Sequence, residues 1–206
     1  MRRHWNYLKY VLRHKWFVFR EGCKLGVPLL ILICHDWDKF LPDEWFPYAR
    51  TFYAPNGEKR YAESIEFAQA WAKHQQRNKH HWQWWLMVMM PDHNCAVPIQ
   101  KYYPCVVWDR GQAQAFVKSE KVSGTYTELH DIPPYHTLHP DPMPDVYRRE
   151  MLADWRGAGL ALGFPDTAAW YAKNRDKMIL HDETRAWIEA QLSIDNRQSK
   201  DAEAQP

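Results

Sequence analysis

The feature that most constrains this chain is a short apolar segment that ends in charged residues. "LLILICHDWDKF", residues 29–40, passes through six apolar or thiol side chains to His35 and Asp36, and Lys39 follows three residues later. The apolar stretch from Leu25 to Cys34 is too short to span a bilayer and is typical of a buried helix. Because a buried, unpaired carboxylate is strongly unfavourable, we expect a cation or a hydrogen-bond donor beside Asp36. A metal ion is one such cation.

Composition limits the class of protein. The chain has 206 residues, enough for one domain with an insertion, and its 25% charged and 46% hydrophobic residues are ordinary for a globular protein. A net charge of +2 does not predict an extended nucleic-acid surface. The four cysteines form no C-x-x-C pair, which favours reduced thiols in a cytoplasmic protein.

The N-terminus does not predict an export or membrane signal. It reads "MRRHWNYLKYVLRHKW", and its charges interrupt any signal-peptide core. We therefore expect no membrane partner. A basic amphipathic helix lying on a membrane, over residues 2–24, is the alternative.

Helical periodicity predicts an all-α fold. Over residues 3–22, Tyr7, Val11, His14 and Val18 share one face by 4-3-4 spacing, so His14 points inward with the apolar side chains. Further helices are predicted from Pro28 to about Asp38, from Pro42 or Asp43, over 57–90 as one long or broken helix, over 144–163, and twice more before residue 194.

Residues 91–145 interrupt this helical pattern with prolines and scattered β-formers. We expect an irregular insertion that can contain a short β-hairpin, within a single helical domain spanning 1–193 and followed by a polar tail over 194–206. The insertion joins two helices that carry site residues, so we expect it to shape a substrate pocket. Its candidate lining residues are Tyr102, Tyr103, Trp108 and His136. A surface decoration or an oligomer contact is the alternative, and the oligomeric state stays open.

Histidines and carboxylates recur on the predicted inner faces. His74 and His81 are seven residues apart and share a helical face, and a bend after Asn78 could direct His80 to the same point. Glu150 and Asp154 share a face by i,i+4 spacing. Imidazole and carboxylate are the ligands that borderline and hard cations prefer.

Each of these residues also has a purely structural interpretation. A lone inward histidine such as His14 is often a hydrogen-bonded core residue, and His80 and His81 could lie on a solvated helix surface. The carboxylates of the late helix could form a solvated face beside Arg148 and Arg149. The tryptophans near His81 could pack in the core or wall a base-stacking pocket (Trp82, Trp84 and Trp85). The buried setting of His35 and Asp36, together with Lys39 and the inward His14, favours a metal site.

The order of these residues resembles the HD-domain superfamily. That superfamily has a histidine on one helix, His-Asp-x-x-Lys at the end of another and an aspartate on a late helix, which correspond here to His14, "HDWDK" and Asp154. His74, His80 and His81 resemble the extra ligands of its dinuclear members. The blocks "HDWDKFLPDEWFPYARTFY", "NKHHWQWW", "MPDVYRREMLADWRGAG" and "KMILHDETRAW" also resemble an uncharacterised family of short phage and bacterial proteins. In two respects the chain departs from the dinuclear pattern: His74 and His80 are unusually close, and no "GYP" follows.

The resemblance implies an HD-like helical bundle that acts as a metal-dependent phosphohydrolase on a nucleotide or another small phosphoester. One or two divalent ions (Mn, Fe, Zn, Ni, Co or Mg) would be held by His14, His35, Asp36, His74, His80, His81 and Asp154. Asp36 and Lys39 are the candidate catalytic residues. A diiron oxygenase and a non-catalytic, metal-stabilised binding protein are the alternatives.

Overall fold

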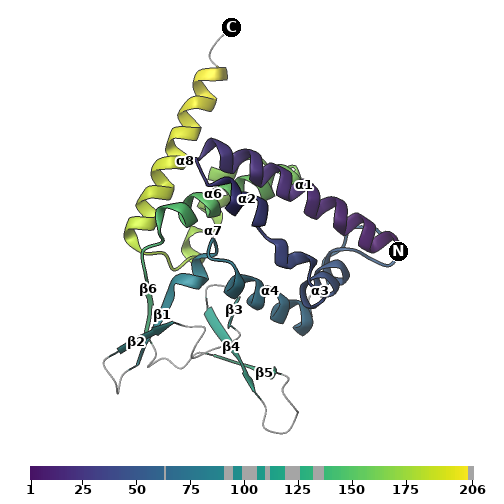
Figure 1. Cartoon of the computed structure of the whole chain (residues 1–206). Coiled ribbons are helices and arrows are strands. Elements are labelled where there is room, and N and C mark those ends of the chain that lie inside the picture. Colours follow the sequence, from purple (N-terminus) through teal and green to yellow (C-terminus); the bar gives the residue numbers. More distant parts are fainter. Residues whose placement is uncertain are drawn as a thin grey trace.

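The chain is predominantly helical (Figure 1). The computed structural model describes residues 1–62, 64–90, 95–98, 106–109, 112–118, 126–131 and 137–203, and describes side chains over 1–62, 64–88 and 138–194. The α-helices are α1 (Arg2–Lys24), α2 (Leu29–Cys34), α3 (Pro42–Phe52), α4 (Ile65–Arg77), α6 (Asp145–Leu162), α7 (Thr167–Asn174) and α8 (Asp182–Glu203). Short 3-10 turns cover Trp37–Phe40 (η1), Trp82–Trp85 (η2) and Arg175–Lys177 (η3).

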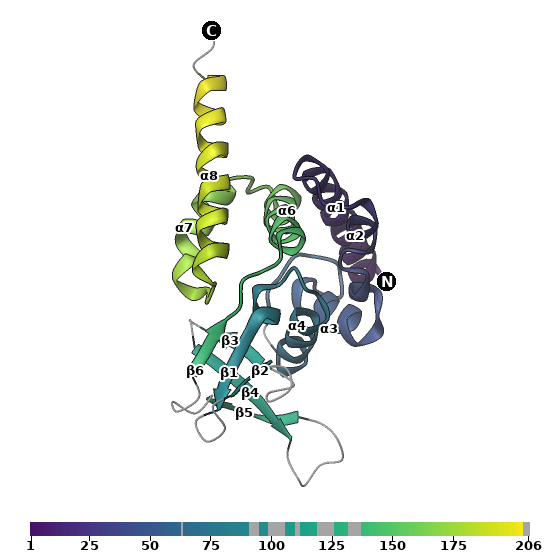
Figure 2. The same cartoon turned by 60° about the vertical axis from the view of Figure 1, so that its left-hand side comes forward.

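Helix α6 lies between α1 on one side and α7 with α8 on the other (Figure 2). The contact between α1 and α6 is close because α6 carries glycine at its crossing point. A Cβ atom on Gly157 would lie 2.5 Å from the Val18 side chain and 2.7 Å from the Val18 main-chain nitrogen. This close approach brings the inner face of α1 against the α6 segment that carries Glu150 and Asp154.

Two apolar clusters form the core. One joins α1, α3 and α4 through Tyr7, Val11, Tyr48 and Ala70. The other joins η2, β1 and α6 to α8, and it contains Trp82, Leu86, Val88, Met143, Met151, Leu152, Tyr171, Met178, Leu180, Ile188 and Leu192. On α1, His14 comes one turn after Val11 of the first cluster. On α6, Glu150 comes directly before Met151 of the second cluster. The buried polar residues therefore lie beside both clusters.

The inserted region contains two small antiparallel sheets (Figure 1). The first has the order β2-β1-β6, and the second has the order β3-β4-β5. The strands are β1 (Leu86–Met90), β2 (Cys95–Pro98), β3 (Val106–Asp109), β4 (Gln112–Lys118), β5 (Tyr126–Asp131) and β6 (Thr137–Pro140). The predicted all-α fold with a β-containing insertion is confirmed, although the insertion is more regular than the sequence indicates. None of the described helices combines the length and apolarity needed to cross a membrane.

The predicted long helix over 57–90 is wrong at both ends. Helix α4 covers only Ile65–Arg77, and "LMVMM" forms strand β1. The Ser64 side chain accepts a hydrogen bond from the Phe67 N–H and so caps α4. Strand β1 forms as the middle strand of its sheet, with β2 and the distant β6 as its hydrogen-bonding partners. A short apolar run does not by itself distinguish a strand from a buried helix.

The expected burial of the apolar segment before His35 is also wrong. In α2 only Leu32 is buried, whereas Leu29, Leu30 and Ile33 are 60%, 73% and 63% exposed. The helix has only six residues and contacts α1 through one side, where Leu32 packs against Gly22. At the other end of the chain, α8 continues through Glu203 and includes part of the expected tail, a segment rich in helix-forming Gln, Lys, Glu and Ala.

Candidate metal centre

Backbone geometry at Asp36 directs two consecutive side chains inward. Helix α2 ends at Cys34, and Asp36 has φ 52° and ψ 30°, in the left-handed region. It is the non-glycine residue with positive φ in the described part of the chain. Aspartate is one of the few non-glycine residues that adopt this conformation, which costs about 1–2 kcal/mol for L-residues in general and is concentrated at functional sites. The turn buries both His35 and Asp36, at 2% and 1% exposure.

One group of candidate ligands lies between α1 and α6. His14 Nε2 is 3.4 Å from Asp36 Oδ2 and 3.1 Å from Asp154 Oδ1. His35 Nε2 is 3.5 Å from each of the same two carboxylate oxygens. The four side chains therefore direct two nitrogens and two oxygens at one point, with all ligand atoms within 4.8 Å of one another.

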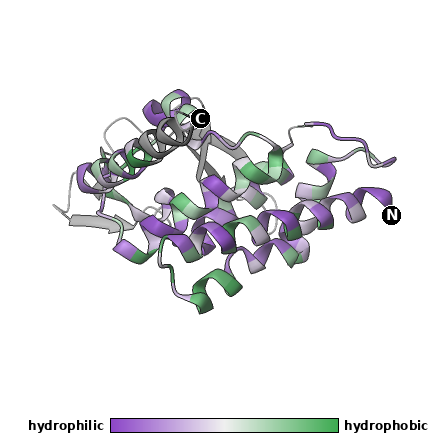
Figure 3. Ribbon diagram, turned by 90° about the horizontal axis from the view of Figure 1, so that it is seen from above, coloured by the Kyte–Doolittle hydropathy of each residue, from purple (hydrophilic) through white to green (hydrophobic). Residues whose placement is uncertain are grey.

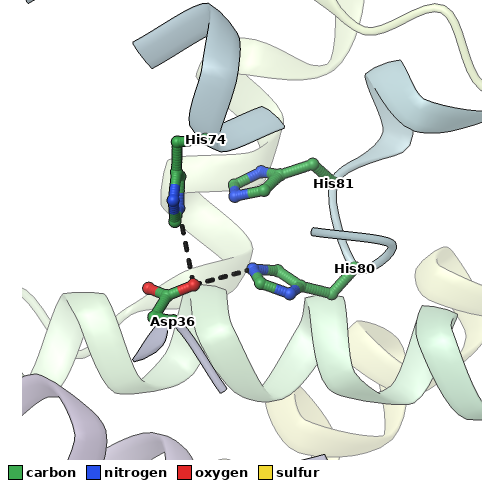
Figure 4. Close-up of side chains that lie close together, drawn as sticks. All are labelled: Asp36, His74, His80 and His81. Atoms are coloured by element: carbon green, nitrogen blue, oxygen red, sulfur yellow. Dashed lines mark ion pairs between the residues drawn. The ribbon is translucent and has the colours of Figure 1, made fainter. Parts of the chain in front are cut away.

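A second group lies on the other side of Asp36 (Figure 4). Asp36 Oδ1 is 3.4 Å from His74 Nε2 and 3.3 Å from His80 Nε2, and the His81 ring lies beside both histidines. Helix α4 ends before His80, and its C-cap Asn78 has an extended backbone (φ −113°, ψ 114°). The bend that this produces directs His80 and His81 toward the point that His74 faces from the helix.

Two properties of these groups suit a metal ion: the spacing of the ligand atoms, and the presence of buried ligand atoms without hydrogen-bond partners. Metal–ligand bonds of about 2.1 Å place neighbouring ligand atoms about 3.0–3.4 Å apart in octahedral or tetrahedral geometry, close to the separations across each group. Among the described side chains, His35 Nε2, Asp36 Oδ1, His80 Nε2 and His81 Nε2 are buried and have no hydrogen-bond partner. Buried polar atoms without partners are unfavourable, so their convergence points to a bound cation. These histidine and carboxylate groups could hold a metal ion.

Carboxylates outside the two groups orient the histidine rings. Glu150, on α6, has Oε1 2.9 Å from His35 Nδ1 and 3.4 Å from His80 Nδ1. A carboxylate on the far nitrogen fixes the tautomer that leaves Nε2 free to bind metal and raises its basicity. Glu150 thus serves one histidine of each group.

His74 is held in the same way from η1 and α3. Its Nδ1 is 3.0 Å from Asp38 Oδ2 and 3.1 Å from Glu44 Oε2. The Asn78 amide donates to Asp38 Oδ2 at 2.6 Å, and Arg77 donates to Glu44 Oε1 at 2.6 Å. Both carboxylates are buried, so these donors offset part of the cost of their charge.

The carboxylates of the two groups are ionised. Burial by itself would raise the pKa of Asp36, but the nearby His35, Lys39 and His74 outweigh it, so the pKa lies well below its usual range. The pKa of Asp154 is also well below its usual range, because the nearby His14 and His35 outweigh its burial. Both side chains therefore carry the negative charge that a metal ligand requires.

The surroundings of the histidines shift their pKa values in opposite directions. Burial would lower the pKa of His80, but contacts with Asp36 and Glu150 raise it to about 10. The pKa of His14 is raised against its burial by Asp154 and Asp36. His81 differs, because burial and the nearby His80 and His74 hold its pKa well below its ordinary value. His81 is therefore neutral near pH 7.

Lys39 contacts the ligands directly. Its Nζ is 2.9 Å from Asp36 Oδ2 and 2.9 Å from His74 Nε2. Burial would lower the pKa of Lys39, but Asp36 and Asp154 raise it above its ordinary value, so the side chain is a cation. The ammonium group thus offsets part of the carboxylate charge at the boundary between the two groups.

A cavity of about 510 Å³ opens onto both groups. Asp154 of the first group and His81 of the second lie in its wall. The rest of the wall is mainly aromatic and apolar side chains of α4, η2, α6 and α7, together with a few polar groups: Trp71, Gln75, Trp82, Gln83, Met151, Trp155, Ala158, Gly159, Leu162, Phe164, Thr167, Trp170, Asn174, Lys177 and Met178. This size and lining are typical of small-molecule sites.

Comparison with known proteins identifies the family of this chain. The chain matches a family of unknown function (DUF5662) over residues 3–105 and 126–194. The chain belongs to this family. No curated protein and no solved structure matches it. The DUF5662 match covers all seven candidate ligands, and its internal gap, residues 106–125, falls within the insertion at 91–145.

In this DUF5662 protein the structure brings together every side chain singled out as a ligand from the sequence: His14, His35, Asp36, His74, His80, His81 and Asp154. Sequence reasoning did not identify Asp38 and Glu44 as partners of His74. Asp38 lies within "HDWDK", but no local pattern links Glu44 to His74, thirty residues later. The side chains of Tyr102, Tyr103, Trp108 and His136 lie outside those that the structure describes.

Proposed function

We propose that this protein is a metal-dependent phosphohydrolase that acts on a small phosphoester such as a nucleotide. The observation that carries the proposal is the position of Asp36. Its Oδ2 faces the His14–Asp154 pair, and its Oδ1 faces His74 and His80. One carboxylate shared by two ligand groups is the arrangement expected of a two-metal site for phosphoryl transfer.

The ligand set favours metals that accept both nitrogen and oxygen. The second group offers three imidazoles and one carboxylate oxygen, which suits Mn, Fe, Co, Ni or Zn better than Mg, a cation that prefers oxygen ligands. A divalent ion held there would lower the pKa of a bound water toward neutrality and would polarise a phosphoryl oxygen.

The protein side chains then have distinct roles. Asp36 holds the two ligand groups together, and Lys39 balances its charge from 2.9 Å away. Lys39 is not among the residues that line the cavity, so its contact with Asp36 supports a charge-balancing role better than direct binding of phosphate. Glu150 acts as a positioning residue through His35 and His80.

The cavity supports a substrate with an apolar or aromatic body. A phosphoryl group beside Asp154 and His81 would leave the rest of the ester against Trp155 and Trp170, whose ring centroids are 5.3 Å apart. Such walls exclude water from the reacting end and can stack on a planar group.

The test is metal analysis of the purified protein, followed by phosphate release from a panel of nucleotides and aryl phosphomonoesters with added Mn²⁺. We expect bound metal and turnover that is lost with a chelator and in Asp36→Asn. Iron with oxygen consumption and no phosphate release would favour an oxygenase instead. Bound metal that raises the Tm without any turnover would favour a binding protein.

A further inference from the structure

A large apolar surface lies on the outer side of α1 and α2, away from the candidate metal centre. We call it the apolar face, and it consists of exposed side chains from α1, α2, η1 and α3: Trp5, Leu12, Trp16, Leu29, Leu30, Ile33, Trp37, Phe40 and Phe46. Each of these side chains is at least 42% exposed. These elements contact one another, and exposed apolar side chains grouped in this way mark an interaction site.

The members on α1 share one side of the helix. At about 100° per residue, Trp5, Leu12 and Trp16 fall within roughly 40° of one another. The buried residues of α1, such as Val11 and Val18, lie on the opposite side and face the interior. Helix α1 therefore has two apolar sides, and only one of them packs inside the protein.

The members on other elements adjoin this strip. The Lys15 ammonium contacts the main-chain oxygens of Ile33 and His35, which ties the end of α2 to the middle of α1. Viewed from above, α2 is a hydrophobic segment at the edge of the molecule (Figure 3). Nearer the N-terminus, Phe40 stacks on Trp45, whose indole N–H donates to His4 of α1.

A row of cations borders the apolar strip of α1. The exposed basic residues of this helix fall about 40–100° round the helix from Trp5: Arg2, Lys9, Arg13, Arg20 and Lys24. Glu21 is the single acidic residue of α1, and Arg20 and Lys24 share it. The Lys9 ammonium lies 5.2 Å from the Trp5 ring. The outer side of α1 thus presents aromatic and aliphatic groups next to uncompensated positive charge.

From this arrangement we infer that the apolar face docks the protein on the surface of an anionic lipid bilayer. Tryptophan and leucine beside lysine and arginine match the interfacial zone, where apolar groups enter the acyl boundary and cations meet lipid phosphates. Charge complementarity favours the bilayer over a second copy of the chain, because a second copy would bring an equally cationic border. The protein would lie on the membrane without spanning it.

Docking by this face leaves the candidate centre accessible. The residues that line the cavity come from α4, η2, α6, α7 and the adjoining turns, and none of them belongs to α1 or α2. The His14 side chain lies on the side of α1 that faces α6, so the helix backbone would separate it from the lipid. The bilayer would therefore hold the protein with its cavity open to the solvent.

The test is co-sedimentation of the full-length protein with vesicles. We expect binding to an equal mixture of phosphatidylglycerol and phosphatidylcholine, little binding to phosphatidylcholine alone, and weaker binding as salt rises. Leu30→Ser with Ile33→Ser should weaken binding on the order of tenfold or more. Lys9→Gln and Arg13→Gln should each weaken it about fivefold.

The matched control is Ile194→Ser, an exposed isoleucine on α8 and outside the apolar face, which should bind like the natural protein. Circular dichroism would show that each variant is folded. Absence of vesicle binding at low salt overturns the inference, and equal binding to both vesicle types overturns its electrostatic part. A concentration-dependent dimer that is lost in Leu30→Ser with Ile33→Ser, without lipid binding, would assign the face to a second copy.

Discussion

His35 and Glu150 are 115 positions apart in the chain, and their Nδ1 and Oε1 atoms lie 2.9 Å apart in the interior. The same Glu150 oxygen is 3.4 Å from His80 Nδ1. A single carboxylate on α6 therefore orients one imidazole from each ligand group. The two groups are joined twice, through Asp36 on the ligand side and through Glu150 behind the rings.

Replacing Glu150 should weaken metal binding in both groups. Glu150→Gln keeps the shape of the side chain but removes the charge that orients His35 and His80. Loss of such a partner typically lowers metal affinity about 10- to 100-fold. Titration with Zn²⁺ or Mn²⁺ would measure the effect, and Glu183→Gln, at an exposed carboxylate of α8, is the control. Unchanged affinity would assign Glu150 to stability alone.

Asp36→Ala should strip the metal and abolish turnover while leaving a folded protein. The substitution removes an oxygen ligand from each group. It leaves only imidazoles in the second group, which bind a hard cation poorly, and leaves Asp154 as the one carboxylate of the first. Metal content by plasma emission and circular dichroism would be compared with those of Asp176→Ala, a change at a 97% exposed carboxylate. Full metal content in Asp36→Ala would contradict the shared-carboxylate site.

Metal binding should release protons and become tighter as pH rises. The folded state holds a proton on His80 with a pKa of about 10, against an ordinary 6.5. That proton stabilises the fold fully below about pH 6.5, and its contribution is lost as pH rises toward 10. A metal ion needs neutral imidazole, so it must displace the proton. The gain in Tm from metal over chelator should therefore be larger near pH 9 than near pH 6, and an equal gain at both would refute this account.

Gly157→Ala should damage the centre without touching a ligand. The added methyl would meet Val18 at 2.5 Å, including main-chain atoms of α1, and must push α1 and α6 apart. Overpacking of this kind costs about 1–3 kcal/mol. We expect a lower Tm together with weaker metal binding, because His14 and Asp154 face each other across this contact. A lower Tm with unchanged affinity would show that the ligands tolerate the shift.

Trp170→Ala should raise KM and leave metal content unchanged. Trp170 lines the cavity beside Trp155 but belongs to neither ligand group. Loss of one aromatic wall should weaken binding of a planar substrate by about tenfold, or roughly 1.4 kcal/mol. Steady-state kinetics on the best substrate of the phosphoester panel would be compared with those of Trp16→Ala, an exposed tryptophan of α1 outside the cavity. Equal KM values for the two variants would show that the substrate does not bind against Trp170.

Local periodicity was sufficient to predict which way several candidate ligands face, whereas their choice as one ligand set rested on a family resemblance. His14 shares the spacing of Tyr7 and Val11, so any helix that buries those residues also turns His14 inward. Asp154 follows Glu150 by one turn of α6, so the two must face the same side. Such relationships lie within one helix and depend only on its geometry, which is why the sequence alone determined them.

The remaining features depend on contacts between distant segments. Strand β1 is completed on one side by the distant β6, and Glu44 reaches His74 because α3 packs on α4. The composition of α2 indicates burial, yet Leu29, Leu30 and Ile33 stay exposed because nothing in the described chain covers them. Hydrophobicity determines how strongly a segment avoids water, whereas only the tertiary structure decides whether another part of the chain is there to cover it.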